Sequence, residues 1–236
     1  MLRFFRRLRR SMIANGKLKS YLLYAAGEIL LIVIGVLLAI QVNAMQERRA
    51  ERKSELAIYG TIKDQLLNYR SILEDDAGYN QHYLAQFTYA STLIAQNDRT
   101  CLDTLGKIAR NLINYSDFDA TGNIYESLVN SGEINLLHNP DIVEGVRQLE
   151  EDFLYVNRME NIHYDAVLAY VIPGIQPLVT FSTGAVQAPE ALFEPNFQNL
   201  LLLLLRIMEE KADAYQSTLD TIAEVVERIE GEVGTD

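Results

Sequence analysis

The chain has 236 residues, of which 49% are hydrophobic, and it carries a formal net charge of −11 at pH 7. An excess of acidic residues repels the phosphates of DNA and RNA, so we expect no nucleic-acid partner. The single cysteine, Cys101, excludes an internal disulfide framework.

Residues 21–42, with the sequence YLLYAAGEILLIVIGVLLAIQV, form the longest apolar stretch of the chain. A helix of this length rises roughly 33 Å, which is enough to cross the roughly 30 Å hydrocarbon core of a bilayer. A cleaved signal peptide is the alternative, but the apolar regions of such peptides are shorter than this one, which also contains an acid. We therefore predict a retained transmembrane helix, with the lipid bilayer as its partner.

Basic residues flank the predicted span unevenly. Residues 1–20 hold seven lysines and arginines and no acid, whereas the four basic residues at 48, 49, 52 and 53 are interleaved with glutamates. Because lysine and arginine collect on the cytoplasmic side, this bias predicts a cytoplasmic N-terminus and an extracytoplasmic C-terminal domain. Residues 1–20 are thus a basic cytoplasmic segment. It is either a short helix on the anionic inner leaflet or an unstructured tail that only sets the topology.

Glu28 is the one acid within the predicted span. A carboxylate in hydrocarbon is costly and normally faces a partner, a cavity or water. Gly35 lies on the same helical face, and with Ala39 it offers a small-residue surface for close approach of another helix. We therefore predict a membrane-helix interface of Glu28, Gly35 and Ala39, facing a second copy of the chain or another membrane protein. The alternative is a protonatable Glu28 on an ion path, which we rank below packing and assembly.

The helical pattern continues after the span through a charged stalk at residues 43–55. Beyond the stalk, apolar residues recur at spacings of three and four, which is typical of a helix with one buried face. They are Leu56, Tyr59, Ile62, Leu66, Tyr69 and Leu73. We expect a kink or break near Asp76, Ala77 and Gly78, and the end of the helix at Asn97 and Asp98.

Three more helices are expected before residue 173. The first covers residues 100–115, and the second begins near Ile124 and stops at Ser131 and Gly132. The third has a strong start, with Asn139 as its N-cap and Pro140 in its first position, and it runs towards Tyr170. Its apolar side comprises Ile142, Val146, Leu149, Phe153, Val156 and Ile162.

The remainder combines an irregular segment with a long final helix. Three prolines and two glycines at residues 173–189 favour a loop, with a candidate short strand at residues 178–181. The final helix is expected from near Pro195 to near Gly231, with apolar positions that nearly follow a heptad. These positions are Leu201, Leu204, Met208, Ala212, Tyr215, Leu219, Ile222, Val226 and Ile229. The chain is thus predicted to be all-α: the transmembrane helix continues into an ectodomain, residues 56–236, built as a bundle of four or five helices.

One short motif resembles a calcium site. Asp117, Asp119 and Thr121 match the first ligand positions of an EF-hand loop, but Leu128 stands where the closing bidentate glutamate is required. Aspartate and threonine also cap helices, so we favour capping and predict no metal ligand.

No other residue pattern predicts chemistry. His82, His138 and His163 are isolated, without the spacing of a zinc site. The adjacent acids Glu150-Glu151 and Glu209-Glu210 point to different helical faces, which makes them poor acid–base pairs. We expect no catalytic residue and no cofactor. We expect Cys101 to lie in the core, with an intermolecular disulfide as the alternative.

Two blocks of the sequence resemble an uncharacterised family of small single-span membrane proteins of Gram-negative bacteria, classified as a domain of unknown function. One block is FFRRLRR at residues 4–10 with YLLYAAGEILLIVIGVLLAIQVN at residues 21–43. The other is IYESLVNSGEINLLHNPDIVEGVRQLEEDF at residues 124–153. The chain departs from the family at Ser20, where lysine is expected, and at Asn43-Ala44, where Asn-Trp is common. The resemblance implies a bacterial inner-membrane protein with a helical extracytoplasmic domain, and it implies no activity.

Two functional hypotheses from different classes follow. The leading one is a non-enzymatic, single-pass inner-membrane protein whose helical extracytoplasmic domain serves interaction, assembly or sensing. Such a protein would form a homo-oligomer or bind another membrane protein. The alternative is an oligomeric channel or proton-conducting accessory subunit that uses Glu28. An enzyme ranks third.

Overall fold

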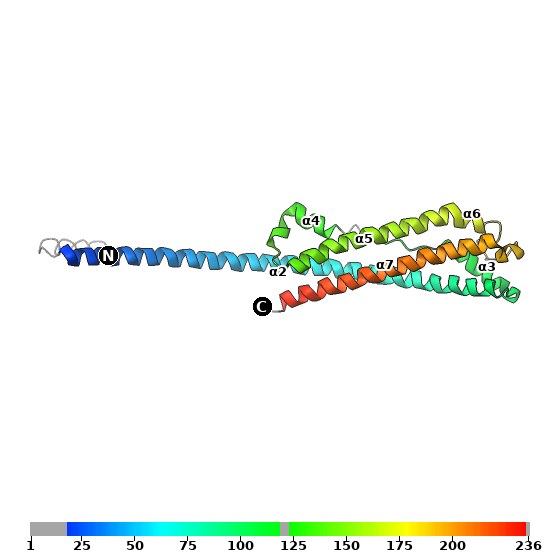
Figure 1. Cartoon of the computed structure of the whole chain (residues 1–236), viewed down its shortest axis with the longest axis horizontal. Helices are drawn as coiled ribbons and strands as arrows, with labels where there is room; N and C mark the ends of the chain where they lie inside the picture. The colour runs from blue at the N-terminus through cyan, green and yellow to red at the C-terminus, as the bar shows by residue number, and fades with distance from the viewer. Residues whose placement is uncertain (1–17, 119–122, 235–236) are drawn as a thin grey trace. The chain divides into compact units, whose positions relative to one another are not determined.

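The computed structural model describes residues 18–118 and 123–234 of the chain. Within these residues there is no strand, and five helices have eight or more residues (Figure 1). They are α2 (Leu18–Ala95), α3 (Leu102–Asn111), α4 (Ile124–Ser131), α5 (Pro140–Ala166) and α7 (Pro195–Val233). The prediction of an all-α chain is confirmed. The chain divides into two compact units, Met1–Ser54 and Glu55–Asp236.

The described part of the first unit is the beginning of α2. The leucines, isoleucines and valines at residues 22–42 are 44–72% exposed. Among the described residues, α2 is the one helix long and apolar enough to cross a membrane, and none of its most apolar window is buried. Such a helix near the N-terminus is compatible with a membrane protein.

Helix α2 runs without interruption through the predicted break at Gly78, so that prediction is wrong. A glycine within a helix costs only about 1 kcal/mol relative to alanine. Burial on both sides outweighs this cost, because Leu73, Asn80 and Phe87 occupy one helical face at intervals of seven residues and are 0–2% exposed.

The predicted end of this helix is confirmed. Helix α2 ends at Ala95, Asn97 adopts a left-handed conformation with φ 53°, and Asp98 caps the next turn by accepting a hydrogen bond from the Thr100 amide. That turn is a 3-10 helix, Arg99–Cys101, which leads into α3. Cys101 is half-buried and packs against the hydrophobic core, and its thiol donates to the Asp98 carboxylate over 3.5 Å.

Helix α4 and the start of α5 follow the sequence signals. Helix α4 ends at Ser131, and it is capped by Gly132, whose φ of 77° favours glycine. After the 3-10 turn Glu133–Leu136, the Asn139 side chain accepts hydrogen bonds from the amides of Asp141 and Ile142, and Pro140 is the first residue of α5. Both predictions are confirmed.

Beyond Ala166, α5 passes into a π-helical turn, Val167–Val171, and then into α6 (Ile172–Ile175). The candidate strand at residues 178–181 is wrong, because the segment makes only an isolated bridge between Val179 and Val186. Both residues of that bridge lie in a loop rich in turns. A 3-10 turn, Glu190–Phe193, precedes α7.

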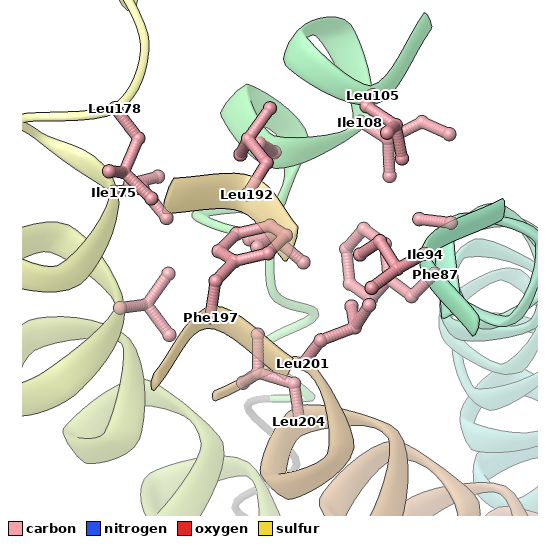
Figure 2. Close-up of a cluster of buried hydrophobic side chains, with 14 of the residues drawn as sticks. Phe87, Ile94, Leu105, Ile108, Ile175, Leu178, Leu192, Phe197, Leu201 and Leu204 are labelled. Carbon is pink, nitrogen blue, oxygen red and sulfur yellow. The ribbon is translucent and has the colours of Figure 1, made fainter. Parts of the chain in front are cut away.

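Two hydrophobic clusters form the core of the second unit. Cluster A joins α2, α4, α5 and α7. Its members include Tyr59, Ile62, Leu66, Leu73, Ile124, Leu128, Ile142, Val146, Leu149, Phe153, Val156, Ile222, Val225 and Ile229. Cluster B joins the last part of α2 with α3, the segment after α5 and the start of α7 (Figure 2). Its members include Phe87, Ile94, Leu105, Ile108, Val171, Ile175, Leu192, Phe197, Leu201 and Leu204.

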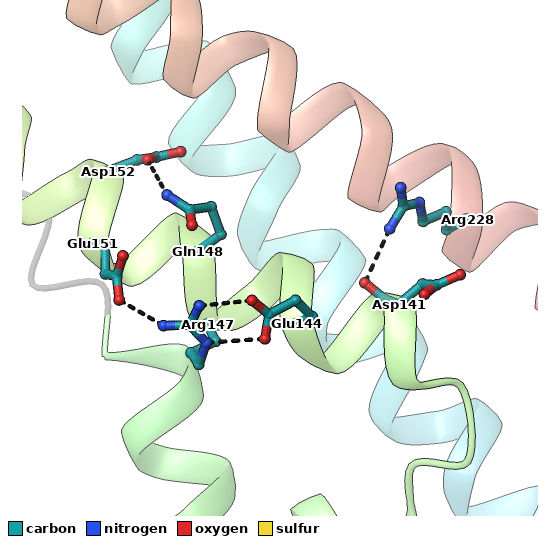
Figure 3. A network of polar contacts seen from close by, with 7 residues as sticks. All are labelled: Asp141, Glu144, Arg147, Gln148, Glu151, Asp152 and Arg228. Atoms are coloured by element: carbon teal, nitrogen blue, oxygen red, sulfur yellow. Dashed lines mark hydrogen bonds and ion pairs between the residues drawn. The ribbon is translucent and has the colours of Figure 1, made fainter.

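Helices α5 and α7 lie side by side (Figure 1). A Cβ at Gly145 would lie 2.4 Å from Val225 Cγ2, so a glycine is required for this close approach. Arg228 of α7 donates to the carbonyl of Asp141 at the start of α5, over 3.1 Å (Figure 3). On the exposed side of α5, the Arg147 guanidinium pairs with Glu144 and Glu151, and such exposed pairs add little stability.

The buried face of α7 differs from the predicted one. It follows a regular alternation of three- and four-residue steps: Leu201, Leu204, Met208, Lys211, Tyr215, Thr218, Ile222, Val225 and Ile229. Lys211, Thr218 and Val225 are therefore inside, whereas the predicted Ala212, Leu219 and Val226 are only half-buried. The seam was misassigned because two of its positions are polar.

Candidate functional site: a buried polar layer

A layer of polar side chains separates the two hydrophobic clusters. Asn80 on α2, Glu160 and His163 on α5, and Lys211 on α7 fall between the residues of cluster A and those of cluster B, and Tyr215 is itself a member of cluster A. We call these residues the polar layer; they are Asn80, Ser116, Glu160, His163, Lys211 and Tyr215, all 0–4% exposed. Each helical member stands in the inward-facing three–four pattern of its helix, where an apolar side chain is the rule.

Glu160 and Lys211 are the charged pair of the layer. The Lys211 ammonium lies 3.7 Å from Glu160 Oε1 and 5.6 Å from the centre of the Tyr215 ring. The Tyr215 hydroxyl donates a short hydrogen bond to Glu160 Oε1. An anion from α5 and a cation from α7 are thus held together inside the core.

The polar layer also holds the irregular segment between α3 and α4. Lys211 Nζ donates to Ser116 Oγ over 2.7 Å and to Ser116 O over 3.4 Å. Ser116 Oγ is 2.9 Å from the Tyr215 hydroxyl, and the Phe118 amide donates to Glu160 Oε2 over 2.5 Å. All of these contacts join side chains of the long helices to the chain that crosses them.

Two members of the layer are incompletely hydrogen-bonded. Neither ring nitrogen of His163 has a hydrogen-bond partner among the described residues, and the same holds for Asn80 Oδ1, although Asn80 Nδ2 donates to Met208 O over 2.9 Å. A buried polar atom without a partner costs about 1–3 kcal/mol. The polar layer is therefore not an arrangement optimised for stability.

Burial dominates the electrostatics of the layer. It lowers the pKa of Lys211 to about 8 and raises the pKa of the Glu160 carboxyl, even though the two groups attract each other. It also lowers the pKa of His163 to about 3, assisted by the positive charge of Lys211, so the imidazole is neutral at pH 7. The pKa of Tyr215 is raised, first by burial and then by Glu160, so its hydroxyl remains a donor.

A second polar cluster lies at the start of α5. Glu55 Oε1 accepts hydrogen bonds from the His138 amide over 2.7 Å and from the Tyr59 hydroxyl over 3.1 Å. Burial raises the pKa of Tyr59 to about 12, so it stays protonated and donates. Asn139, the N-cap, donates to Glu232 over 2.7 Å. These contacts join α2, α5 and α7 and fix the start of α5.

The residues predicted as a membrane-helix interface lie on the first part of α2. Seven and eleven residues of α-helix separate Gly35 and Ala39 from Glu28, so the helix places all three on one face. A Cβ at Gly35 would meet nothing within 4 Å. The interface remains a prediction.

The other candidate residues do not assemble. Within the described residues there is no group of three or more side chains with the donors to hold a metal ion. Asp119 and Thr121 of the calcium-like motif lie outside the described residues. His82 is exposed and contacts Gln86, and His138 is mostly exposed beside Glu55. His163 alone is buried.

Sequence reasoning missed Glu160 and Lys211, although a signal was present. Glu160 follows Val156 by four residues and Lys211 follows Met208 by three, which places both in the buried stripes of their helices. Extending each apolar stripe through its polar interruptions would have found both residues.

Comparison with known proteins gives one match. Residues 28–206 match a family described as a family of unknown function, DUF6090. The match covers most of the chain, from the apolar part of α2 into α7. No curated protein and no solved structure matches the chain.

Proposed function

We propose that this chain, which belongs to the DUF6090 family of unknown function, is a single-pass inner-membrane protein with a helical extracytoplasmic domain for interaction, assembly or sensing. Helix α2 carries the proposal. Its residues 22–42 expose a continuous apolar surface, and its residues 59–94 contribute side chains to both clusters of the core. One helix thus contains both a candidate anchor and part of the domain that would be anchored.

A non-enzymatic role is consistent with the polar layer. Catalysis needs reacting groups that a substrate can reach, whereas Glu160, Lys211 and Tyr215 are at most 4% exposed. Their hydrogen bonds go to the protein itself. A structural role for the polar layer therefore fits its geometry better than a catalytic one.

The topology can be tested with reporter fusions. An alkaline-phosphatase fusion at the C-terminus should be active and a cytoplasmic fluorescent reporter at the same place should be dark, because basic residues are concentrated before residue 21. Membrane fractionation of the native chain under alkaline carbonate gives the control for integral insertion. An inactive phosphatase together with a bright fluorescent fusion would reverse the proposed orientation.

Self-association through the apolar part of α2 is part of the proposal. Gly35→Leu should weaken assembly in detergent, because it blocks close backbone approach, and Glu28→Leu should remove a polar contact. Ala26→Leu is the matched control, since Ala26 lies about 160° around the helix from Glu28. Size-exclusion chromatography with light scattering measures the oligomeric state of each protein in detergent. A monomeric wild type without partners, unaltered by either change, would refute the interface.

A channel is the second candidate, and the position of Glu28 in an apolar helix favours it. In this case the purified protein in liposomes should conduct protons or ions, and Glu28→Gln should abolish the flux without changing the oligomeric state. Flux that is absent, or that persists in Glu28→Gln, leaves the interaction role as the better one.

A further inference from the structure

Residues 112–118, which we call the strap, cross the polar layer on the way from α3 to α4. Leu112, at the start of the strap, is 0% exposed and belongs to cluster B. Phe118, at its end, is 1% exposed and belongs to cluster A, where its ring lies 5.7 Å from the ring of Phe153. Ser116 lies in the layer between them.

The second half of the strap is held by side chains rather than by backbone pairing. Among the described residues, no backbone–backbone hydrogen bond involves residues 115–118. Within the part of the chain that the structure describes, their hydrogen bonds are those of Ser116 with Lys211 and Tyr215, and that of the Phe118 amide with Glu160. Ring contacts with α5 add to these, since the ring of Tyr115 lies 5.1 Å from that of Tyr164 and the ring of Phe118 packs on Phe153. The tether therefore comes entirely from α5 and α7.

These tethering groups are costly ones to bury. A buried ion pair can be replaced by apolar residues of similar volume without loss of stability, and often with a gain. Lys211 and Glu160 stand where the flanking positions are apolar, and His163 next to them has no hydrogen-bond partner among the described residues. Stability therefore does not explain why polar side chains occupy these buried positions. Their contacts with the strap do explain it.

We propose that the polar layer is a latch that holds the strap, and that the strap opens as a unit when the Glu160 and Lys211 contacts are lost. Opening removes Phe118 from Phe153 and exposes the edge of cluster A together with the charged pair. The fold thus contains a strap that can open while the three long helices stay packed. This device concerns the second unit alone and stands whether or not α2 crosses a membrane.

The test separates latching from stability by removing both charges together. In full-length protein in detergent micelles, Glu160→Leu/Lys211→Met removes both charges of the buried pair together, so its midpoint of chemical unfolding should equal or exceed that of the wild type. Hydrogen exchange measured by mass spectrometry should nevertheless speed up at least about tenfold in peptides covering residues 115–118, because the Phe118 amide loses its acceptor. Exchange within α5 and α7 should stay at the wild-type rate.

Val156→Ala is the matched control, because Val156 is buried on α5 but has no polar contact with the strap. Val156→Ala should lower the unfolding midpoint. Amide hydrogen exchange in the strap should then be no faster than in the neighbouring helices. If the strap of the double variant exchanges at the wild-type rate, the latch is wrong. Acceleration that is equal in the strap, α5 and α7 also overturns it, because the strap would then have no separate opening.

Discussion

At the scale of single residues, His163 is the most unusual side chain of the polar layer. It is 1% exposed, and neither of its ring nitrogens has a hydrogen-bond partner among the described residues. Lys211, which carries positive charge, lies close enough to disfavour the imidazolium further. The folded protein therefore holds this histidine neutral far below the pH at which an exposed histidine takes up a proton.

This gives a prediction for His163→Leu. The folded pKa of about 3 lies below the unfolded value of 6.5. The stability of the wild type therefore falls as the pH drops from 6.5 towards 3, because the unfolded chain takes up a proton at His163 and the folded chain does not. The loss is about 1.4 kcal/mol per pH unit within this window. The variant should be more stable than the wild type at pH 7 by about 1–3 kcal/mol, since a buried unpaired group is removed, and this advantage should grow at pH 5.

Urea unfolding of both proteins at pH 7 and pH 5 measures the difference. The raised pKa of Glu160 acts in the opposite direction, because its contribution falls as the pH rises, but it is common to both proteins and largely cancels. Equal losses of stability between pH 7 and pH 5 in the two proteins would show that His163 is not the responsible group.

Residue-level chemistry was the hardest part to predict from the sequence. The N-cap Asn139 and the helix stop at Gly132 were predictable, because capping depends on residues close in the chain. The polar layer was not, since its contacts join residues that are 42 to 128 positions apart. A lysine within an otherwise apolar helical stripe is readily assigned to the exposed face of the helix when the residues that it contacts are unknown.

At the scale of elements, two glycines illustrate how tertiary contacts decide an outcome. A Cβ at Gly106 on α3 would lie 2.2 Å from the Gly184 carbonyl oxygen, whereas a Cβ at Gly78 on α2 would meet nothing within 4 Å. Gly184 itself has a φ of 75°, so the loop cannot easily move aside. Glycine is thus required on α3 and merely tolerated on α2.

Gly106→Ala should therefore destabilise the domain by about 1–3 kcal/mol through overpacking. Gly78→Ala, the matched control, should stabilise it by about 0.5–1 kcal/mol, because alanine favours the helix and restricts the unfolded chain. Chemical unfolding followed by circular dichroism measures both changes. Equal effects of the two substitutions would mean that the contact between α3 and Gly184 is not close.

Elements were predicted well where one periodic stripe dominates. The predicted start of α5 and the two predicted ends of α7 lie close to the observed ones, and the predicted end of α2 is correct. The predicted break at Gly78 failed because local helix preference was weighed without the buried face that runs through it. In the irregular segment between α6 and α7, the predicted strand at residues 178–181 failed, because the single bridge between Val179 and Val186 does not make a strand.

At the scale of the whole molecule, every member of both hydrophobic clusters lies at residue 59 or later. A chain of residues 55–236 therefore retains the complete core while losing the exposed apolar part of α2. We expect this fragment to be helical, water-soluble and cooperative in unfolding, whereas the full chain requires detergent. Circular dichroism and size-exclusion chromatography without detergent test this. Aggregation of the fragment would show that the first unit contributes to the fold of the second.

The π-helical turn at Val167–Val171 has a consequence for how the chain tolerates changes of length. A π turn contains one residue more than the α-helix needs, and here the Ile172 amide reaches back five residues to the Val167 carbonyl. Deleting a residue elsewhere in α5 would rotate every later side chain by about 100°. Deleting Ala169, which is exposed in the turn, would instead restore an ordinary helix and leave Ile175 facing cluster B. Among homologous chains, a single-residue gap is therefore more acceptable at this turn than anywhere along the preceding 27 residues of α5.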